Sequence, residues 1–291
     1  MSAANSKQYK EAERRSWDSV AHGWEKWWRT IEKGAGIVSR RLIDLAGIKI
    51  GSRVLDISTG IGEPAITVAR EVGSTGRVLA TDFSSEMLSI AKKRAINAGL
   101  ERVIEFKQGD TGTIELPDSY FDAALCRFGL MFLPDLDTAL LNIYGSLVNN
   151  GRFAAAVWAS SEGDSLFTST MNTILKETRT SPPPKGAPGP FSLSDESLLR
   201  NYFVNTGFKD VAIDRINVTF NFWSSNEYAI FVLETAGPLQ VMLSNESSER
   251  REHILGAVSE SARKFADNTG AVKFSNGAIC IIGTKSKRKT Q

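Results

Sequence analysis

Asp56, Gly60 and Gly62 lie within seven residues of one another, directly after the apolar pair Val54-Leu55. Glycine lets the backbone come close to a ligand, and the start of a following helix offers free N–H groups and positive dipole charge. Asp56 adds a negative charge at the same place. This junction therefore suits a ligand that carries both an amino group and a carboxylate, or a diphosphate.

A second carboxylate, Asp82, stands twenty residues after Gly62. The segment Gly60-Ile61-Gly62-Glu63-Pro64-Ala65 satisfies the dinucleotide fingerprint with alanine at its third small position. Asp82 would accept hydrogen bonds from ribose hydroxyls in either case. These residues predict an adenosine ligand on a doubly wound fold, and they leave NAD and S-adenosylmethionine both open.

Three features favour S-adenosylmethionine. Asp56 would repel a diphosphate, whereas it would attract the α-ammonium group of a methionine moiety. The segment Gln108-Gly109-Asp110-Thr111 supplies a carboxylate that can accept from an adenine amine. An aromatic segment precedes the first predicted strand, and a simple dehydrogenase domain does not need one.

The elements that position these residues alternate between strand and helix, which predicts a mostly parallel sheet covered on both faces. The predicted strands are Arg53–Ile57, Arg77–Thr81, Val103–Lys107, Asp122–Cys126 and Arg152–Trp158. The predicted helices are Gly36–Ala46, Gly62–Val72, Ser84–Ala98 with Ser84 as N-cap, and Asp135–Val148.

The pattern changes after Trp158. We expect a helix over Ser165–Glu177, a loop or lid hinge over Ser181–Pro190, a helix capped by Ser194, a strand over Lys209–Phe222 and a final strand over Val272–Gly283. Glu227–Phe265 is predicted to be helical, with breaks near Gly237-Pro238 and Ser244-Asn245. Residues 1–34 form a predicted aromatic helical lid, and residues 35–291 a main domain with helical insertions at about 160–194 and 226–268.

Several motifs, taken in order, carry a family resemblance. They are Val54–Gly62, Ala80–Leu88, Gly109-Asp110, Leu116–Asp122, Arg127–Asp135 and Gly151-Arg152. With them the chain resembles the class I S-adenosylmethionine-dependent methyltransferases, and within these the ubiquinone/menaquinone-biosynthesis C-methyltransferase-like (methyltransferase type 11) group. One departure is Ser58, where the family pattern usually has glycine.

The resemblance implies a Rossmann-like methyltransferase fold: an α/β, doubly wound, seven-stranded, mostly parallel sheet whose last strand is antiparallel, with helical lid insertions. It implies S-adenosylmethionine as cofactor, S-adenosylhomocysteine as product and no metal. The cofactor-binding residues that it implies are Asp56, Ser58, Thr59, Gly60, Gly62, Asp82, Phe83, Met87, Gly109, Asp110, Thr111 and Arg127.

Trp17, Trp24 and Trp28 recur at helical spacing in the N-terminal segment. This stripe fits a helix packed on the domain or a lid over cofactor and acceptor. An interfacial membrane helix fits less well, because Asp18 and Lys26 mix charge signs near the stripe. His22 is a candidate general base, and a solvated helix histidine is the alternative.

The expected acceptor is a small, apolar or aromatic molecule such as a quinol, terpenoid or lipid. Ligands of open α/β sheets bind beyond the carboxyl ends of the strands. The candidate substrate-binding residues are Trp24, Trp28, Phe128, Met131, Phe132 and Trp158. In-line transfer from an activated sulfonium relies on positioning and water exclusion, so a strong base is not obligatory.

Composition sets the remaining limits. A net charge of +2 over 291 residues gives no general case for nucleic-acid binding. Cys126 and Cys280 lie in apolar runs and are predicted to be core residues. Neither a secretory signal nor a membrane span is predicted, so we expect a cytoplasmic protein for which peripheral membrane contact stays open. The basic run Lys285–Lys289 is typical of a solvated chain end, and the oligomeric state is left open.

Two other functions stay open at this point. One is a non-catalytic subunit that binds S-adenosylmethionine without turnover, and the other is an NAD-dependent oxidoreductase. Cys126-Arg127-Phe128-Gly129 stands where amide and adenine N-methyltransferases carry a Pro-Pro-aromatic motif, which argues against that chemistry.

Overall fold

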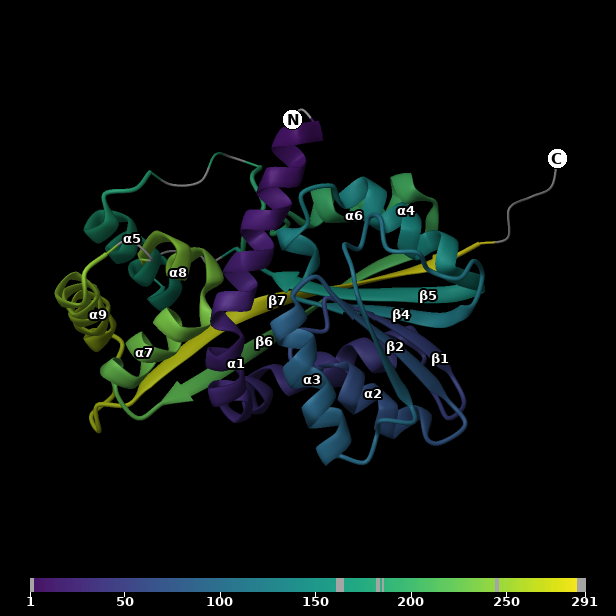
Figure 1. The fold of residues 1–291 in the computed structure, drawn as a ribbon, viewed down its shortest axis with the longest axis horizontal. Helices are drawn as coiled ribbons and strands as arrows, with labels where there is room; N and C mark the ends of the chain where they lie inside the picture. Colours follow the sequence, from purple (N-terminus) through teal and green to yellow (C-terminus); the bar gives the residue numbers. More distant parts are fainter. Residues whose placement is uncertain (1–2, 161–164, 182–183, 185, 244–245, 287–291) are drawn as a thin grey trace. The chain divides into compact units, whose positions relative to one another are not determined.

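The computed structural model describes residues 3–160, 165–181, 184, 186–243 and 246–286 (Figure 1). The chain divides into two compact units. The helical unit comprises Met1–Ala35, Ser161–Ala187 and Asn217–Asn276, and the sheet unit comprises Gly36–Ser160, Pro188–Ile216 and Gly277–Gln291. The N-terminal segment thus shares one unit with the two later insertions.

A seven-stranded sheet runs in the order β3-β2-β1-β4-β5-β7-β6 (Figure 1). Its strands are β1 (Arg53–Ile57), β2 (Arg77–Asp82), β3 (Ile104–Gln108), β4 (Phe121–Arg127), β5 (Leu147–Trp158), β6 (Phe208–Phe222) and β7 (Val272–Lys285). The first five strands pair in parallel, and β7 pairs antiparallel with β5. The predicted fold class is confirmed, including its antiparallel last strand.

The sheet unit carries the helices α2 (Ala65–Val72), α3 (Ser85–Asn97), η1 (Leu130–Phe132), α4 (Leu136–Ser146) and α6 (Glu196–Thr206). Ser84 caps α3, as predicted, because its side chain accepts the Met87 amide. The predicted cap of α6 was wrong by one residue. Asp195 accepts the amides of Ser197 and Leu198, and its negative charge also suits the positive end of the helix dipole.

Aromatic side chains pack α6 against the strands β5 and β6 of the sheet. Phe153 stacks on Phe203 with ring centroids 5.3 Å apart, and Phe208 packs beside both rings. The cluster continues through Leu140 and Ile143 of α4. Cys126 belongs to it and is buried, as is Cys280, which confirms both as core residues.

The helical unit carries α5 (Leu166–Thr178), α7 (Ser225–Thr235), α8 (Gly237–Leu243), α9 (Ser248–Arg263) and the first part of α1 (Ala3–Ala46). The helical segment breaks between α7 and α8, next to Gly237, as predicted. The predicted break at Ser244-Asn245 lies outside the described residues. Of the proline-rich segment, residues 182, 183 and 185 also lie outside them.

Helix α1 is continuous over 44 residues, so the predicted start of a separate helix at Gly36 was wrong. Glycine near this point suggested a break. In the structure Gly34 instead permits a close approach, because a Cβ there would lie 2.5 Å from the Thr219 carbonyl oxygen. Gly23 does the same for α7, where a Cβ would lie 1.8 Å from the Glu234 carbonyl oxygen.

Two tryptophans fix α1 to α7 within the helical unit. Trp24 Nε1 donates to the Thr235 carbonyl at 2.9 Å, and Trp27 Nε1 donates to Glu234 Oε2 at 2.6 Å. Trp27 also packs edge-on against Phe222 and Phe231. Part of the tryptophan surface of α1 is therefore buried by packing within this unit.

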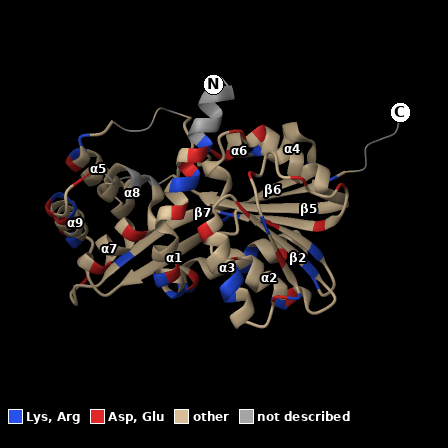
Figure 2. Cartoon of the chain, viewed as in Figure 1, with Lys and Arg blue, Asp and Glu red and all other residues tan. Residues whose placement is uncertain are grey.

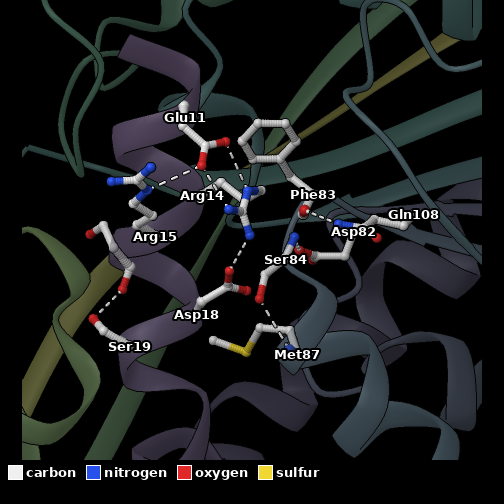
Figure 3. A network of polar contacts seen from close by, with 11 residues as sticks. Glu11, Arg14, Arg15, Asp18, Ser19, Asp82, Phe83, Ser84, Met87 and Gln108 are labelled. Atoms are coloured by element: carbon white, nitrogen blue, oxygen red, sulfur yellow. Dashed lines mark hydrogen bonds and ion pairs between the residues drawn. The ribbon is translucent and has the colours of Figure 1, made fainter. Parts of the chain in front are cut away.

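Charged side chains pair along α1 on the turns before these tryptophans (Figure 3). Arg14 contacts Glu11 at 2.7 Å and Asp18 at 2.5 Å, and Arg15 contacts Glu11 at 3.1 Å. Hydrogen bonds from Arg14 and Arg15 lower the pKa of Glu11 to about 2. Such i,i+3 and i,i+4 pairs support a helix locally. Among the described residues, no helix is long and apolar enough to cross a membrane.

Candidate cofactor site

The carboxyl end of β1 holds two buried side-chain oxygen atoms that make no hydrogen bond in the described part of the chain. Asp56 is fully buried, and its Oδ2 accepts the Ala65 amide at 2.9 Å. Among the residues that the structure describes, Asp56 Oδ1 and Thr59 Oγ1 have no partner of hydrogen-bond geometry. Unsatisfied buried groups are costly, so the pair indicates a place where a polar ligand binds.

Burial raises the pKa of Asp56 to about 7. The Thr59 hydroxyl, which lies close without forming a well-oriented bond, opposes that rise, as do the Arg127 charge and the Ala65 amide. A neighbouring cation would favour the ionised carboxylate. A positively charged ligand group beside Asp56 would therefore lower its pKa and stabilise the carboxylate.

Gly60 lies next to this pair and faces open space. Its φ is 57°, and a Cβ at this position would meet no atom within 4 Å. Its amide donates to Asp82 Oδ2 at 2.8 Å, and Asp82 Oδ1 accepts the Ser84 amide at 2.9 Å. Asp82 therefore ties the glycine loop of β1 to the end of β2, a role that the sequence did not reveal.

Gly62 is packed rather than open. A Cβ there would lie 3.0 Å from Ile66 Cδ1 and 3.3 Å from Ala91 Cβ. Arg94 of α3 donates to the Ile61 carbonyl at 2.5 Å and contacts Glu63 at 3.4 Å. Sequence reasoning missed this anchor, although an acid directly after a glycine loop is a signal that could have suggested it.

The residues predicted around an adenine come from the end of β2, the first turn of α3 and the segment after β3 (Figure 3). Met87 is buried, and its amide donates to Ser84 Oγ at 3.0 Å. Phe83 is half-buried, and Gln108 Nε2 donates to its carbonyl at 3.2 Å. The Gly109 amide donates to the Asp82 carbonyl at 3.0 Å, which joins the two strand ends.

The loop after Gly109 is braced from α4. Asp110 Oδ1 accepts the Gly112 amide at 2.8 Å. Asn142 Nδ2 donates to the carbonyls of Thr111 and Ile114 at 2.8 and 2.9 Å. Asn142 is a positioning residue that no sequence motif indicated, because it comes from an element 30 residues further along the chain.

Residues at the end of β4 and just after it lie beside the β1 loop. Arg127 Nη1 donates to Ser39 Oγ at 2.9 Å, which links it to the last turns of α1. Ser58 has a φ of 54°, and its side chain occupies the room left by Gly129. A Cβ on Gly129 would lie 2.5 Å from Ser58 Cβ, so this glycine accommodates the departure from the family pattern.

Phe128 and Trp158 form a stacked pair with ring centroids 4.1 Å apart. Both are half-buried and stand at the carboxyl ends of β4 and β5. Phe132 is also half-buried, whereas the Met131 side chain is buried in the core. The Met131 carbonyl accepts the Gly189 amide at 2.9 Å and Ser192 Oγ at 2.7 Å.

The other predicted site residues belong to the helical unit. Trp24 and Trp28 are half-buried there, and Arg29 lies 5.1 Å from the Trp28 ring. The His22 side chain is 83 % exposed, with Nδ1 3.4 Å from Glu25 Oε2. Their roles toward an acceptor stay predictions.

Comparison with known proteins identifies the family. The sequence profile of the ubiE/COQ5 methyltransferase family matches residues 19–167, which is just over half of the chain and includes the whole glycine loop. The chain belongs to the ubiE/COQ5 methyltransferase family. This family uses S-adenosylmethionine, so the family match favours that cofactor over NAD.

One curated relative is the ubiquinone/menaquinone biosynthesis C-methyltransferase UbiE of Ectopseudomonas oleovorans. It is 36 % identical over 113 residues, which cover 39 % of this ubiE/COQ5 family member and 66 % of the relative. The chain thus spans less than two thirds of the length of that relative.

Two solved structures share the fold. The YcgJ protein of Bacillus subtilis has a TM-score of 0.56 at 20 % identity, over 86 % of this chain and 98 % of that one. The phosphoethanolamine N-methyltransferase 2 of Haemonchus contortus, in complex with S-adenosyl-L-methionine, has a TM-score of 0.53 at 18 % identity, over 84 % of this chain and 51 % of that one.

The site of this ubiE/COQ5 family member fits S-adenosylmethionine on its own geometry. Asp56 Oδ1 is an unused buried acceptor of the kind that an α-ammonium group needs. Gly60 leaves open space beside it. Among the described residues, no group of three or more His, Cys, Asp or Glu side chains could hold a metal ion.

Proposed function

We propose that this protein transfers the methyl group of S-adenosylmethionine to a small, apolar or aromatic acceptor. The observation that carries the proposal is the buried pair Asp56 Oδ1 and Thr59 Oγ1, unpartnered beside the open face of Gly60. The family match over residues 19–167 supports the same conclusion.

In this proposal each part of the site has one task. Asp56 and Thr59 bind the methionine amino group, with Arg127 balancing the charge. Asp82 binds the ribose while it keeps the Gly60 amide in place. Phe83, Met87, Asp110 and Thr111 surround the adenine, and Ser58, Gly62 and Gly109 give the loops their shape.

The bound cofactor supplies a methyl group already activated by a positive sulfur. The acceptor atom forms a bond to that carbon as the carbon–sulfur bond breaks, and a proton leaves the acceptor. The protein's part is to align the two and to exclude water. Phe128 and Trp158 supply aromatic surface, which favours both a cation and an aromatic acceptor.

The proposed acceptor class is a quinol, terpenoid or lipid-like molecule. The half-buried aromatic side chains Phe128, Phe132 and Trp158 support an apolar acceptor, and the name of the UbiE relative supports a quinol. Trp24 and Trp28 stay proposed acceptor-binding residues, and His22 stays the candidate base.

The test uses purified protein, methyl-labelled S-adenosylmethionine and a whole-cell lipid extract, followed by solvent partition. Label in the organic phase is the expected result, and mass spectrometry then names the acceptor. Label confined to the aqueous phase would overturn the apolar acceptor. Calorimetric titration with S-adenosylmethionine and NADH runs in parallel. Cofactor binding without transfer to any extract would point to the non-catalytic subunit, and NADH binding alone to the oxidoreductase.

A further inference from the structure

Arg94 of α3 reaches the glycine loop that follows β1. Its Nη1 donates to the Ile61 carbonyl at 2.5 Å, and its Nη2 lies 3.4 Å from Glu63 Oε1. The two contacted residues flank Gly62. One planar guanidinium group therefore spans the part of the loop that leads into α2, which its fixed fork of donors allows.

Glu63 connects this contact to α2. Its Oε2 accepts the Thr67 hydroxyl at 2.7 Å and the Thr67 amide at 3.2 Å. The side chains of Glu63 and Arg94 are 6 % and 15 % exposed, so the ion pair is largely shielded from water. Such a pair depends on both partners, because removal of one leaves a buried charge without compensation.

Arg94 differs in burial from the two lysines before it. Lys92, Lys93 and Arg94 follow one another in α3, and Figure 2 shows this basic stretch on the helix. Lys92 and Lys93 are exposed, whereas Arg94 is half-buried. Arg94 is thus the member of the run that faces the glycine loop, and Lys93 carries the same charge on the same turn toward solvent.

Thr59 is hydrogen-bonded to the segment that Arg94 holds. The amides of Gly62 and Glu63 both donate to the Thr59 carbonyl at 3.0 Å. Thr59 Oγ1 is one of the two buried oxygens proposed to bind the methionine amino group. A shift of the segment would therefore move Thr59, whereas Asp82, the proposed ribose ligand, ends β2 and lies outside it.

We propose that Arg94 is a positioning residue that holds the glycine loop in the conformation that binds the amino-acid end of S-adenosylmethionine. This inference rests on the proposed function, from which it takes the cofactor and its orientation. Loss of the Arg94 contacts lowers the fraction of molecules whose loop has the binding conformation, and the apparent Kd rises by the same factor. The adenosine part is bound by residues outside the loop, so its affinity does not change.

The test compares three ligands by calorimetric titration: S-adenosylmethionine, S-adenosylhomocysteine and 5′-methylthioadenosine, which lacks the amino-acid end. Arg94→Gln should raise the Kd of the first two about tenfold or more and leave that of the third nearly unchanged. Arg94→Lys should restore only part of the affinity, because an ammonium group lacks the fork that joins Ile61 to Glu63. Lys93→Gln, the matched control, removes the same charge and should leave all three Kd values unchanged.

Amide hydrogen exchange of the cofactor-free protein tests the loop without a ligand. Arg94→Gln should speed exchange of the Gly62 and Glu63 amides about tenfold and leave the amides of β2 unchanged. Unchanged exchange at Gly62 and Glu63 would overturn this inference alone. Failure of the unaltered protein to bind S-adenosylmethionine would instead overturn the proposed function.

Two results of the titrations would also overturn the inference. One is an equal rise in Kd for all three ligands, since a general loss of structure would then explain it. The other is equal Kd values for Arg94→Gln and Lys93→Gln. If Arg94→Gln fails to fold, the double variant of Arg94→Gln with Glu63→Gln takes its place, because it leaves neither partner of the pair charged.

Discussion

Replacing Gly60 by alanine separates the two roles of a loop glycine, which are backbone conformation and room for a ligand. The φ of 57° costs alanine about 1–2 kcal/mol. Reduced entropy of the unfolded chain returns about 0.4–1 kcal/mol. No neighbouring atom lies within 4 Å of the new Cβ, so no clash is added. The free energy of unfolding should therefore fall by about 1 kcal/mol.

Gly99 provides a matched control for the backbone cost. Its φ is 67°, a Cβ there also meets nothing within 4 Å, and it follows α3 rather than the β1 loop. Gly99→Ala should lose the same free energy of unfolding, about 1 kcal/mol. Gly62→Ala should lose more, because its Cβ would press on Ile66 and Ala91.

Only Gly60→Ala should lose cofactor affinity while staying folded. Its Cβ would fill space that the cofactor needs, and we expect at least a tenfold rise in Kd, about 1.4 kcal/mol. Calorimetric titration with S-adenosylmethionine and urea unfolding of all three variants measure the two quantities. Equal Kd values for Gly60→Ala and Gly99→Ala would refute the reasoning, since the cofactor would then not approach Gly60.

Three further predictions concern Asp56, Gly129 and His22. Because the pKa of Asp56 is raised to about 7, the native state holds a proton that the unfolded state loses near pH 4. The free energy of unfolding should therefore fall by up to about 1.4 kcal/mol per pH unit between pH 4 and pH 7. Asp56→Asn can still accept the Ala65 amide, and in urea unfolding series it should make this fall less steep. Gly129→Ala should cost about 1–3 kcal/mol through its clash with Ser58, and Ser58→Gly should restore part of it in a double-mutant cycle; additive losses would mean that the two do not touch. His22→Gln should lower kcat for a phenolic or quinol acceptor at least tenfold and leave cofactor Kd unchanged, if His22 is the base; an unchanged kcat would remove it from the mechanism.

Local chemistry made the first half of the sheet predictable. β1 has the bounds that the sequence predicted, and Ser84 caps α3, because strand periodicity, glycine turns and capping residues act over a few neighbouring positions. The same signals failed near Gly34 and at Asp195. At Gly34 a glycine that permits close packing looks like a glycine that ends a helix.

Contacts between residues that are far apart in the chain could not be predicted from the sequence. Arg127 reaches Ser39 across 88 positions, Trp24 reaches Thr235 across 211, and Asp82 holds the Gly60 amide. No local pattern encodes such pairs, since they depend on which elements the chain brings together.

The sequence by itself determined the first five strands, the glycine loop and the acids at the ends of β1 and β2, since each follows from turn chemistry and periodicity within about ten residues. Only the tertiary structure decided that the first part of α1 and most of both insertions form one unit, and that Asp56 Oδ1 and Thr59 Oγ1 are buried without partners among the described residues. Burial and satisfaction of polar groups depend on every neighbour that packs around them, and those neighbours come from all parts of the chain.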